Sequence, residues 1–263
     1  MKRLLMAFGL VAGISLFGAG CLSLPPVVVE PAQMVERSLE VTRQAFGSGI
    51  EWVRANVATS TAGQLWLFGF EQEKYRFAFA AARNQLRMSE WRDTYASAVA
   101  GINGVYFMED MQSAGLFMGD GHWQVKRLFD ADKSALMKIG DQFEILDTAT
   151  SGIRLAELKG GAQTYPILIK DGKEMLTRDT GKEARRSWVG TDRDGRVWLG
   201  VLSDGEISLY GLMKRLMEMG INWDMVVNLD GGPSTGIFVK GEEGDVLKET
   251  LGGVPNVLLV ERK

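Results

Sequence analysis

The chain has 263 residues, of which 46% are hydrophobic and 24% charged, the composition of an ordinary globular protein. Its formal net charge is -3, and it contains no long run of Lys or Arg, so we expect no nucleic-acid partner. One cysteine and one histidine exclude an intramolecular disulfide and a Cys/His zinc site, so carboxylates, amides, hydroxyls and arginines must carry any chemistry.

The N-terminal segment predicts a secretory signal. Two basic residues precede an apolar run over 4–17, and small residues lead to Cys21. The run is too short to cross a bilayer comfortably as a helix. Gly18-Ala19-Gly20-Cys21 resembles a bacterial lipobox, in which the Cys is acylated and becomes the mature N-terminus. This resemblance implies a signal peptide over 1–20 and a lipid anchor in the cell envelope, with Leu22 favouring the outer membrane facing the periplasm. The alternative is a short uncleaved anchor with an incidental cysteine.

A tether is expected to follow the anchor. Residues 24–31 read LPPVVVEP and hold three of the six prolines, which favours an extended linker. Apolar residues recur at loosely helical spacing over 33–46. We therefore expect a lipidated N-terminus and tether over 21–48 and one domain over 49–263.

The first part of this domain has the pattern of antiparallel strands. The segments IEWVRANV, QLWLFGF and YRFAFAA, between residues 50 and 82, are rich in aromatic and β-branched residues and are separated by polar turns. A helix capped by Ser89 is expected to run to about Ala98. Strand and turn residues follow around Asn103-Gly104.

The second part predicts two hairpins and one amphipathic helix. Asp171-Gly172 and Asp194-Gly195 are tight-turn pairs between β-rich runs. Residues 208–220 combine a Ser cap, apolar residues at helical spacing and a terminal Gly, and a strand is expected over 223–229. The fold class expected from these elements is α+β: a mixed, largely antiparallel sheet with flanking helices in a single domain.

The segment NLDGGPSTG, residues 228–236, follows this apolar strand directly. Asn228 and Asp230 are two positions apart, so a continuing strand would present both side chains on one face. Gly231 and Gly232 allow a sharp turn and a close approach of the backbone to a ligand. The segment is therefore either an ordinary strand-ending turn or the floor of an active site.

Five segments occur in the order found in one family: GINGVYF (101–107), AQTYPILIKDGK (162–173), RRSWVGTDRDGRVWL (185–199), NLDGGPSTG and VPNVLLV (254–260). Together they resemble the phosphodiester glycosidase family, from about residue 50 to the end of the chain. The resemblance implies hydrolysis at the anomeric carbon of a sugar-1-phosphodiester or a related glycan phosphate. The residues that match family motifs are Asn103, Arg186, Ser187, Asn228, Asp230, Gly231, Gly232 and Ser234.

The chemistry of these residue types suits such a substrate. A guanidinium matches two phosphate oxygens, so Arg186 is the expected phosphate anchor, and N–H groups of the glycine turn offer a second anion site. Asp230 is the candidate base or nucleophile, with Asn103 and Asn228 orienting the sugar hydroxyls or Asp230 itself. The expected catalytic residues are Asp230, Asn103 and Arg186. The expected substrate-binding residues are Asn228, Gly231, Gly232, Ser234 and Ser187.

Several alternatives stay open from the sequence. Glycosyl transfer usually uses two carboxyl groups; a phosphate leaving group reduces the need for an acid, and either Glu109 or Asp110 could be the second carboxyl. Asp230 could merely hydrogen-bond its own turn, and Arg186 could be a solvated charge at a strand edge. His122 is expected in a surface loop.

The expected function is a cell-envelope hydrolase acting on glycan phosphodiesters. The alternative is a non-catalytic lipoprotein that binds phosphorylated glycans. No cofactor is predicted, although Asp and Asn oxygens could hold Mg²⁺ or Ca²⁺. The expected partners are the glycan substrate and, through the lipid anchor, the membrane; the sequence does not determine the oligomeric state. Gln163 and Asn256 are expected to support the site from behind.

Overall fold

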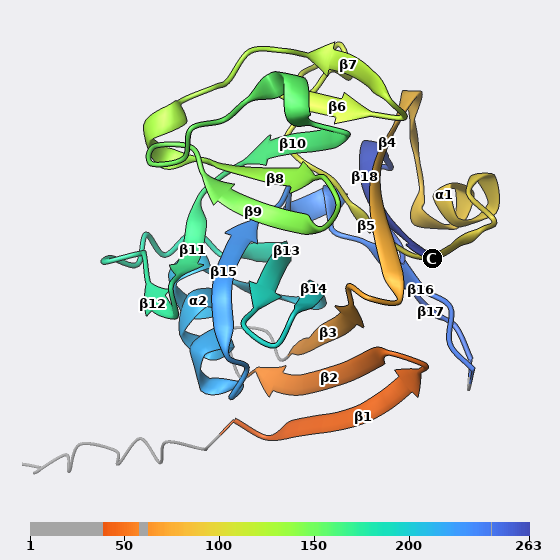
Figure 1. Ribbon diagram of the computed structural model, residues 1–263. Helices are drawn as coiled ribbons and strands as arrows, with labels where there is room; N and C mark the ends of the chain where they lie inside the picture. Colours follow the sequence, from red (N-terminus) through yellow and green to blue (C-terminus); the bar gives the residue numbers. More distant parts are fainter. Residues whose placement is uncertain (1–38, 58–62, 243) are drawn as a thin grey trace, which may run out of the picture. The chain divides into compact units, whose positions relative to one another are not determined.

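The computed structural model describes residues 39–57, 63–242 and 244–263. They belong to one compact unit, Ser38–Lys263. The expected signal peptide, Cys21 and most of the expected tether lie outside the described residues. Within the unit the chain forms three antiparallel sheets and two α-helices (Figure 1).

The largest sheet has eight strands in the order β1-β2-β3-β14-β13-β15-β11-β12. Its strands are β1 (Val41–Gly47), β2 (Ile50–Val57), β3 (Gly63–Glu71), β11 (Ile167–Lys170), β12 (Lys173–Glu174), β13 (Ala184–Asp192), β14 (Arg196–Ile207) and β15 (Trp223–Asn228). The β13–β14 hairpin turns at Gly195, whose φ of 84° suits a residue without Cβ. Asp171 and Gly172 both have positive φ between β11 and β12, so both predicted hairpins are confirmed.

A second sheet of five strands has the order β17-β16-β5-β18-β4. Its strands are β4 (Tyr75–Leu86), β5 (Ala98–Asn103), β16 (Ile237–Val239), β17 (Val246–Lys248) and β18 (Val254–Arg262). The C-terminal strand β18 lies between β4 and β5 and pairs with both. The strand that contains residues 254–262 is therefore an interior strand of this sheet.

The third sheet also has five strands, in the order β7-β6-β10-β8-β9. Its strands are β6 (Phe117–Gly119), β7 (His122–Val125), β8 (Ala135–Ile139), β9 (Phe143–Asp147) and β10 (Gly160–Thr164). Short 3-10 turns occur at η1 (Ala131–Lys133), η2 (Leu155–Glu157) and η3 (Gly232–Ser234).

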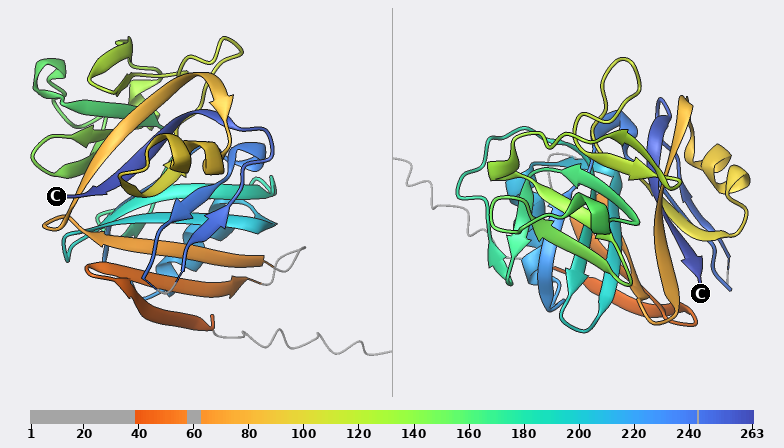
Figure 2. Two further views of the ribbon diagram at one scale, coloured as in Figure 1. Left: turned by 90° about the vertical axis from the view of Figure 1, so that its right-hand side faces the viewer. Right: turned by 45° about the horizontal axis from the view of Figure 1, so that its top comes forward.

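The two α-helices are short and lie on different sheets. Helix α1 (Met88–Thr94) buries Met88 and Trp91 against the second sheet, and helix α2 (Leu209–Glu218) covers a face of the eight-stranded sheet (Figure 2). Ser208 caps α2 as predicted, because its side chain accepts a hydrogen bond from Gly211 N at 3.0 Å. The predicted cap of α1 at Ser89 is wrong: the helix begins after Arg87, whose N–H donates to the Glu90 carboxylate. Neither helix is long and apolar enough to cross a membrane, among the residues that the structure describes.

The main hydrophobic core lies where the three sheets face one another. It contains side chains from each sheet, including Phe68, Phe79 and Phe117, all at most 2% exposed. A second cluster joins α2 to the opposite face of the eight-stranded sheet through Trp188, Trp198 and other apolar residues. Because both faces of the central strands are covered, β14 and β15 contain the apolar runs 197–202 and 225–227.

The predicted α+β fold class is wrong, because the described chain is mostly strand, arranged as three antiparallel sheets with only two short helices. Residues 41–47, inside the segment with loosely helical spacing, form the edge strand β1 instead of a helix. Pairing of β1 with β2 overrides the weak local periodicity, since hydrogen bonds to a neighbouring strand are a tertiary effect. The predicted strands over 50–82 are confirmed by β2, β3 and β4.

Candidate active site

The family-matching segments meet where strands of two sheets end. Asn103 is the last residue of β5, and Asn228 is the last residue of β15, which belongs to the eight-stranded sheet. Ser187 on β13 lies between them, donating a hydrogen bond from Oγ to Asn103 Oδ1 at 2.6 Å. Motifs that are widely separated in the sequence therefore form one cluster.

Asn103 is the buried centre of this cluster, with no exposed surface. Its Oδ1 also accepts from Gly236 N at 3.2 Å, and its Nδ2 donates to the main-chain oxygen of Asp230 at 2.7 Å. Gly236 O accepts from Asn103 N at 3.1 Å. The amide thus holds both ends of the 230–236 turn in place, and Asn103 and Ser187 support the site from inside without lining its surface.

Asn256 fixes the start of the 104–112 loop. Its Oδ1 accepts from Val105 N at 2.7 Å, and its main-chain oxygen accepts from Gly104 N at 2.9 Å. A Cβ at Gly104 would lie 1.9 Å from Asn256 Oδ1, so only glycine permits this approach. The loop that follows Asn103 consequently leaves the sheet in a defined direction.

Asn228 is fully buried and holds two tyrosines. Its Nδ2 donates to Tyr106 Oη at 2.6 Å and to the main-chain oxygen of Tyr165 at 3.3 Å. Its Oδ1 is buried and has no hydrogen-bond partner in the part of the chain that the structure describes. Asn228 therefore acts behind the site surface and joins the 228–236 segment to the loops that carry Tyr106 and Tyr165.

Asp230 is the carboxylate of the cluster. Burial raises its pKa above the ordinary value of 3.8, while hydrogen bonds from Ser234 and from Gly231 N partly offset this effect. The Gly231 N–H donates to Asp230 Oδ1 at 3.0 Å. A partly buried carboxylate with a raised pKa beside a glycine turn is typical of a functional site, although a structural turn can share these features.

The glycine turn is used differently from the sequence hypothesis. Gly231 N–H serves Asp230 itself, which leaves the Gly232 amide of the pair for an anion. Gly232 has a φ of 59°, and a Cβ at Gly231 would lie 2.8 Å from the main-chain oxygen of Arg185. Both glycines are therefore required by the backbone, whichever ligand binds.

Arg186 lies on β13 next to Ser187 and is half-buried. Its Nε donates to Ile207 O at 2.9 Å and its Nη2 to Lys182 O at 2.6 Å, which leaves both N–H groups of Nη1 and the second N–H of Nη2 for a ligand. Burial lowers its pKa, while the neighbouring Tyr106 and Glu206 act in the opposite direction. Because a guanidinium has five N–H donors and only two are used here, a two-point contact with phosphate oxygens does not require either main-chain bond to be broken.

The remaining candidates lie at the edge of the cluster or away from it. Glu109 and Asp110 are exposed on the loop after Asn103, and neither is bonded to the cluster. His122 is exposed as expected, although it is the first residue of strand β7 and not part of a loop. Within the described residues, no group of three His, Cys, Asp or Glu side chains could hold a metal ion.

Sequence reasoning missed the two tyrosines. Tyr106 occupies the aromatic position of the motif after Asn103, and Tyr165 lies within the second matching segment. Their ring centroids are 4.8 Å apart. The sequence signal for Tyr106 was the motif itself, whereas nothing in the sequence connects Tyr165 to Asn228 because the contact is made through a main-chain oxygen.

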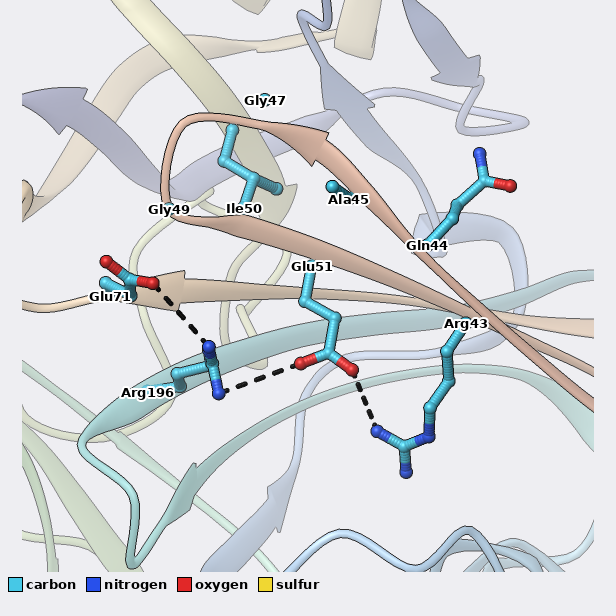
Figure 3. Close-up of a pocket in the computed structure, with 9 residues that line it drawn as sticks. All are labelled: Arg43, Gln44, Ala45, Gly47, Gly49, Ile50, Glu51, Glu71 and Arg196. Carbon is cyan, nitrogen blue, oxygen red and sulfur yellow. Dashed lines mark hydrogen bonds and ion pairs between the residues drawn. The ribbon is translucent and has the colours of Figure 1, made fainter.

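A cavity of about 340 Å³ lies elsewhere, at the β1–β2 turn (Figure 3). Its charged side chains neutralise one another: Glu51 is 2.9 Å from Arg43 and 3.7 Å from Arg196, which also pairs with Glu71. Arg196 is the first residue of β14, whereas Arg186, on β13, pairs with Leu202, which lies further along β14. At about 3.3 Å per residue the two positions are roughly 20 Å apart, so this cavity is not the motif cluster.

The fold and the cluster define a class: a β-rich protein with a partly buried carboxylate in a glycine turn that packs against the β13 segment carrying Arg186. The sequence model of the phosphodiester glycosidase family matches residues 96–261, and the chain belongs to this family. The description of this family is phosphodiester glycosidase. No curated protein sequence matches the chain.

Solved structures share the fold at low sequence identity. A hypothetical protein from Synechocystis superimposes with a TM-score of 0.62 at 13% identity, covering 85% of this chain and 64% of its own. The zebrafish N-acetylglucosamine-1-phosphodiester alpha-N-acetylglucosaminidase catalytic domain, auto-inhibited by its pro-peptide, gives 0.60 at 12% identity, covering 86% and 89%. A putative exported protein from Burkholderia pseudomallei gives 0.55 at 9%, covering 85% and 96%. The chain thus spans less than two thirds of the Synechocystis protein.

Proposed function

We propose that the protein hydrolyses a sugar-1-phosphodiester, or a related glycan phosphate, with Asp230 as the reacting carboxylate. The observation that carries this proposal is the position of Asp230: it is partly buried, bonded to Gly231 N, and close enough to Tyr106 to influence its pKa, as Arg186 does from another strand. A carboxylate and a guanidinium near one phenol are suited to a substrate that joins a sugar to a phosphate. Family membership supports the same reaction class.

In the proposed reaction, water is added across the bond between the anomeric carbon and the phosphate oxygen. Asp230 either removes a proton from the water or attacks the anomeric carbon first, and the phosphomonoester leaves as an anion. The guanidinium of Arg186, through Nη1, and the Gly232 N–H are the proposed hydrogen-bond donors to that anion. Asn103, Ser187 and Asn228 hold the reacting groups in place and do not touch the substrate.

The proposed location is the bacterial cell envelope, through a lipid on Cys21. The support is the sequence of residues 1–21, which resembles a lipoprotein signal. A substrate of the cell envelope, such as a glycan joined through a phosphodiester, would be within reach of an anchored enzyme. The sugar and the second alcohol of the phosphodiester are the unknowns that an activity screen must supply.

The test is turnover of a panel of sugar-1-phosphodiesters by the detergent-solubilised full chain. Release of the free sugar together with a phosphomonoester supports the proposal, and its loss in Asp230→Asn assigns the activity to this site. Saturable binding of the panel without turnover would favour a non-catalytic glycan-binding protein instead. The absence of both turnover and binding would contradict the proposed function.

A further inference from the structure

Three aromatic side chains lie together beside the candidate active site. The Tyr165 ring is 4.8 Å from the Tyr106 ring and 6.0 Å from the Phe129 ring, measured between centroids. Tyr165 is 40% exposed and Phe129 is 44% exposed. We call these three residues the aromatic shelf. Contiguous exposed apolar surface beside polar groups is a feature of ligand-binding sites.

Buried amides hold the shelf in place. Gln163 on β10 is 4% exposed; its Oε1 accepts from Phe129 N at 2.8 Å, and its Nε2 donates to Phe129 O. Asn228 also binds the backbone of a shelf residue, since its Nδ2 donates to the main-chain oxygen of Tyr165. Both exposed rings are thus positioned from inside the protein through their backbone, which lowers the conformational entropy lost when a ligand binds.

The hydrogen bonds of Asn228 determine the direction of the Tyr106 hydroxyl. A main-chain oxygen only accepts, so the Asn228 atom facing Tyr165 O must be Nδ2, and this nitrogen also lies 2.6 Å from Tyr106 Oη. Tyr106 Oη is therefore the acceptor of that bond. Its own proton points away from Asn228 and is free to be donated to another group.

The surroundings of Tyr106 keep this proton on the phenol. Burial and the neighbouring Asp230 carboxylate raise the Tyr106 pKa, while Arg186 acts in the opposite direction. The phenol consequently stays protonated at neutral pH and acts as a hydrogen-bond donor. One hydroxyl of the shelf thus lies within electrostatic range of both the proposed reacting carboxylate and the proposed phosphate anchor.

We propose that the aromatic shelf is the sugar subsite: the C–H face of a pyranose ring packs against Tyr165 and Phe129, and Tyr106 donates its phenolic proton to an oxygen of that sugar. This inference rests on the proposed function and specifies which part of the substrate lies where. The shelf carries no formal charge, so it suits the neutral sugar, whereas the phosphate belongs with Arg186 and Gly232. A pyranose ring has the mixture of C–H faces and hydroxyl edges that such a surface complements.

The test separates the rings from the hydroxyls on the full-length protein. Tyr165→Phe keeps the ring and should stay within twofold of wild type in KM for the best substrate of the panel, whereas Tyr165→Ala should raise KM about tenfold. Tyr106→Phe should lower kcat/KM about tenfold, because the hydrogen bond to the substrate is lost. The substitution also removes the acceptor of the bond from Asn228 Nδ2, so the melting temperature should fall as well, and kcat/KM is measured below the melting transition. Tyr210→Ala on α2, which alters a partly exposed tyrosine next to Lys214, is the matched control and should leave both constants unchanged.

Binding of neutral methyl glycosides, followed by NMR, keeps this inference separate from catalysis. If wild type hydrolyses phosphodiesters but Tyr165→Ala, Phe129→Ala and Tyr106→Phe all match it, the shelf inference fails and the proposed function stands. If wild type shows no turnover but binds a glycoside in a manner lost in Tyr165→Ala, the subsite stands and the reaction fails. Absence of both glycoside binding and turnover contradicts the subsite as well. If Tyr165→Ala does not fold, Phe129→Ala gives the same comparison.

Discussion

Asn103 Nδ2 donates a hydrogen bond to the main-chain oxygen of Asp230 at 2.7 Å, across 127 positions of sequence. The amide is completely buried and all its remaining polar capacity is used by Ser187, Gly236 and its own neighbour Gly104. Asn103, which its motif predicts to be catalytic, therefore positions the residue whose carboxylate is the proposed reacting group. The distinction can be tested because the two roles predict different effects on stability.

Asn103→Asp should destabilise the protein strongly. The substitution replaces a buried donor facing Asp230 O by an acceptor that also carries a charge, and an uncompensated buried group of this kind costs about 3 kcal/mol or more. The free energy of unfolding, measured in urea, should fall accordingly. Ser187→Ala is the milder comparison, expected to cost about 1 kcal/mol, since Asn103 Oδ1 keeps its bond from Gly236 N. Equal stability of Asn103→Asp and wild type would contradict the positioning role.

Asp230→Asn should abolish most activity without unfolding the protein. Asparagine keeps the oxygen that accepts from Gly231 N, but it cannot act as base or nucleophile. Loss of a general base costs about 10² to 10⁴ in kcat. We expect the thermal midpoint at pH 7 to be at least that of wild type. Activity within about threefold of wild type would mean that Asp230 only supports its own turn.

The pH dependence of stability should identify Asp230 independently. Its folded pKa is raised above 3.8, so the folded state holds the proton more tightly than the unfolded state. The contribution of this group to stability is therefore present below pH 3.8 and is lost as the pH rises through the raised value. The difference in free energy of unfolding, Asp230→Asn minus wild type, should increase with pH over this window and then level off. A flat difference between acidic and neutral pH would contradict the raised pKa.

Arg186→Lys should weaken activity although the charge is kept. A lysine ammonium cannot replace the Nε and Nη2 bonds to Ile207 O and Lys182 O while also offering a nitrogen to phosphate. A lost charge-assisted hydrogen bond of about 1.5 to 3 kcal/mol predicts a fall in kcat/KM of roughly tenfold to 150-fold.

The neighbouring arginine provides the matched control for that experiment. Arg185 donates from Nη2 to Thr235 O and Glu249 O, so Arg185→Lys removes similar main-chain bonds without removing the proposed phosphate contact. It should lower stability more than it lowers kcat/KM. If both variants lose activity equally, the phosphate role of Arg186 is not supported.

Gly104→Ala should disturb the loop that leads to Tyr106. The added Cβ would meet Asn256 Oδ1 at 1.9 Å, and both residues are buried. Displacement of a packed backbone costs about 1 to 3 kcal/mol, which would lower the melting temperature by several degrees. Gly152→Ala is the control, since a Cβ there has nothing within 4 Å. The control should melt close to wild type, and no difference between the two variants would argue against the close approach.

The proposed lipid anchor on Cys21 can be tested by mass spectrometry of the membrane-extracted protein. Loss of residues 1–20 together with added acyl mass is the expected result. Cys21→Ser should leave the protein unprocessed or release it from the membrane fraction. A mature protein that still begins with Met1 would refute lipidation.

The sequence by itself determined the parts of this protein that depend on local chemistry. The Asp171-Gly172 and Asp194-Gly195 turns and the Ser208 cap follow from backbone preferences of a few adjacent residues, and each was predictable. The strands between residues 50 and 82 followed from their aromatic and β-branched composition. The family motifs also located the 103, 186 and 230 segments that the structure brings together.

Only the tertiary structure decided the rest, because it depends on contacts between distant residues. Strand β1 forms through pairing with β2, and the division into three sheets with few helices follows from how strands such as β18 insert between others, which no local pattern encodes. Local residue types also cannot distinguish a buried asparagine that positions a loop from one that meets a substrate. The role of Asn103 follows from its hydrogen bonds with Ser187 and Asp230, which lie far away in the sequence. Tyr165 contacts Asn228 through a main-chain oxygen, and because every residue has one, the residue type at position 165 does not predict this contact.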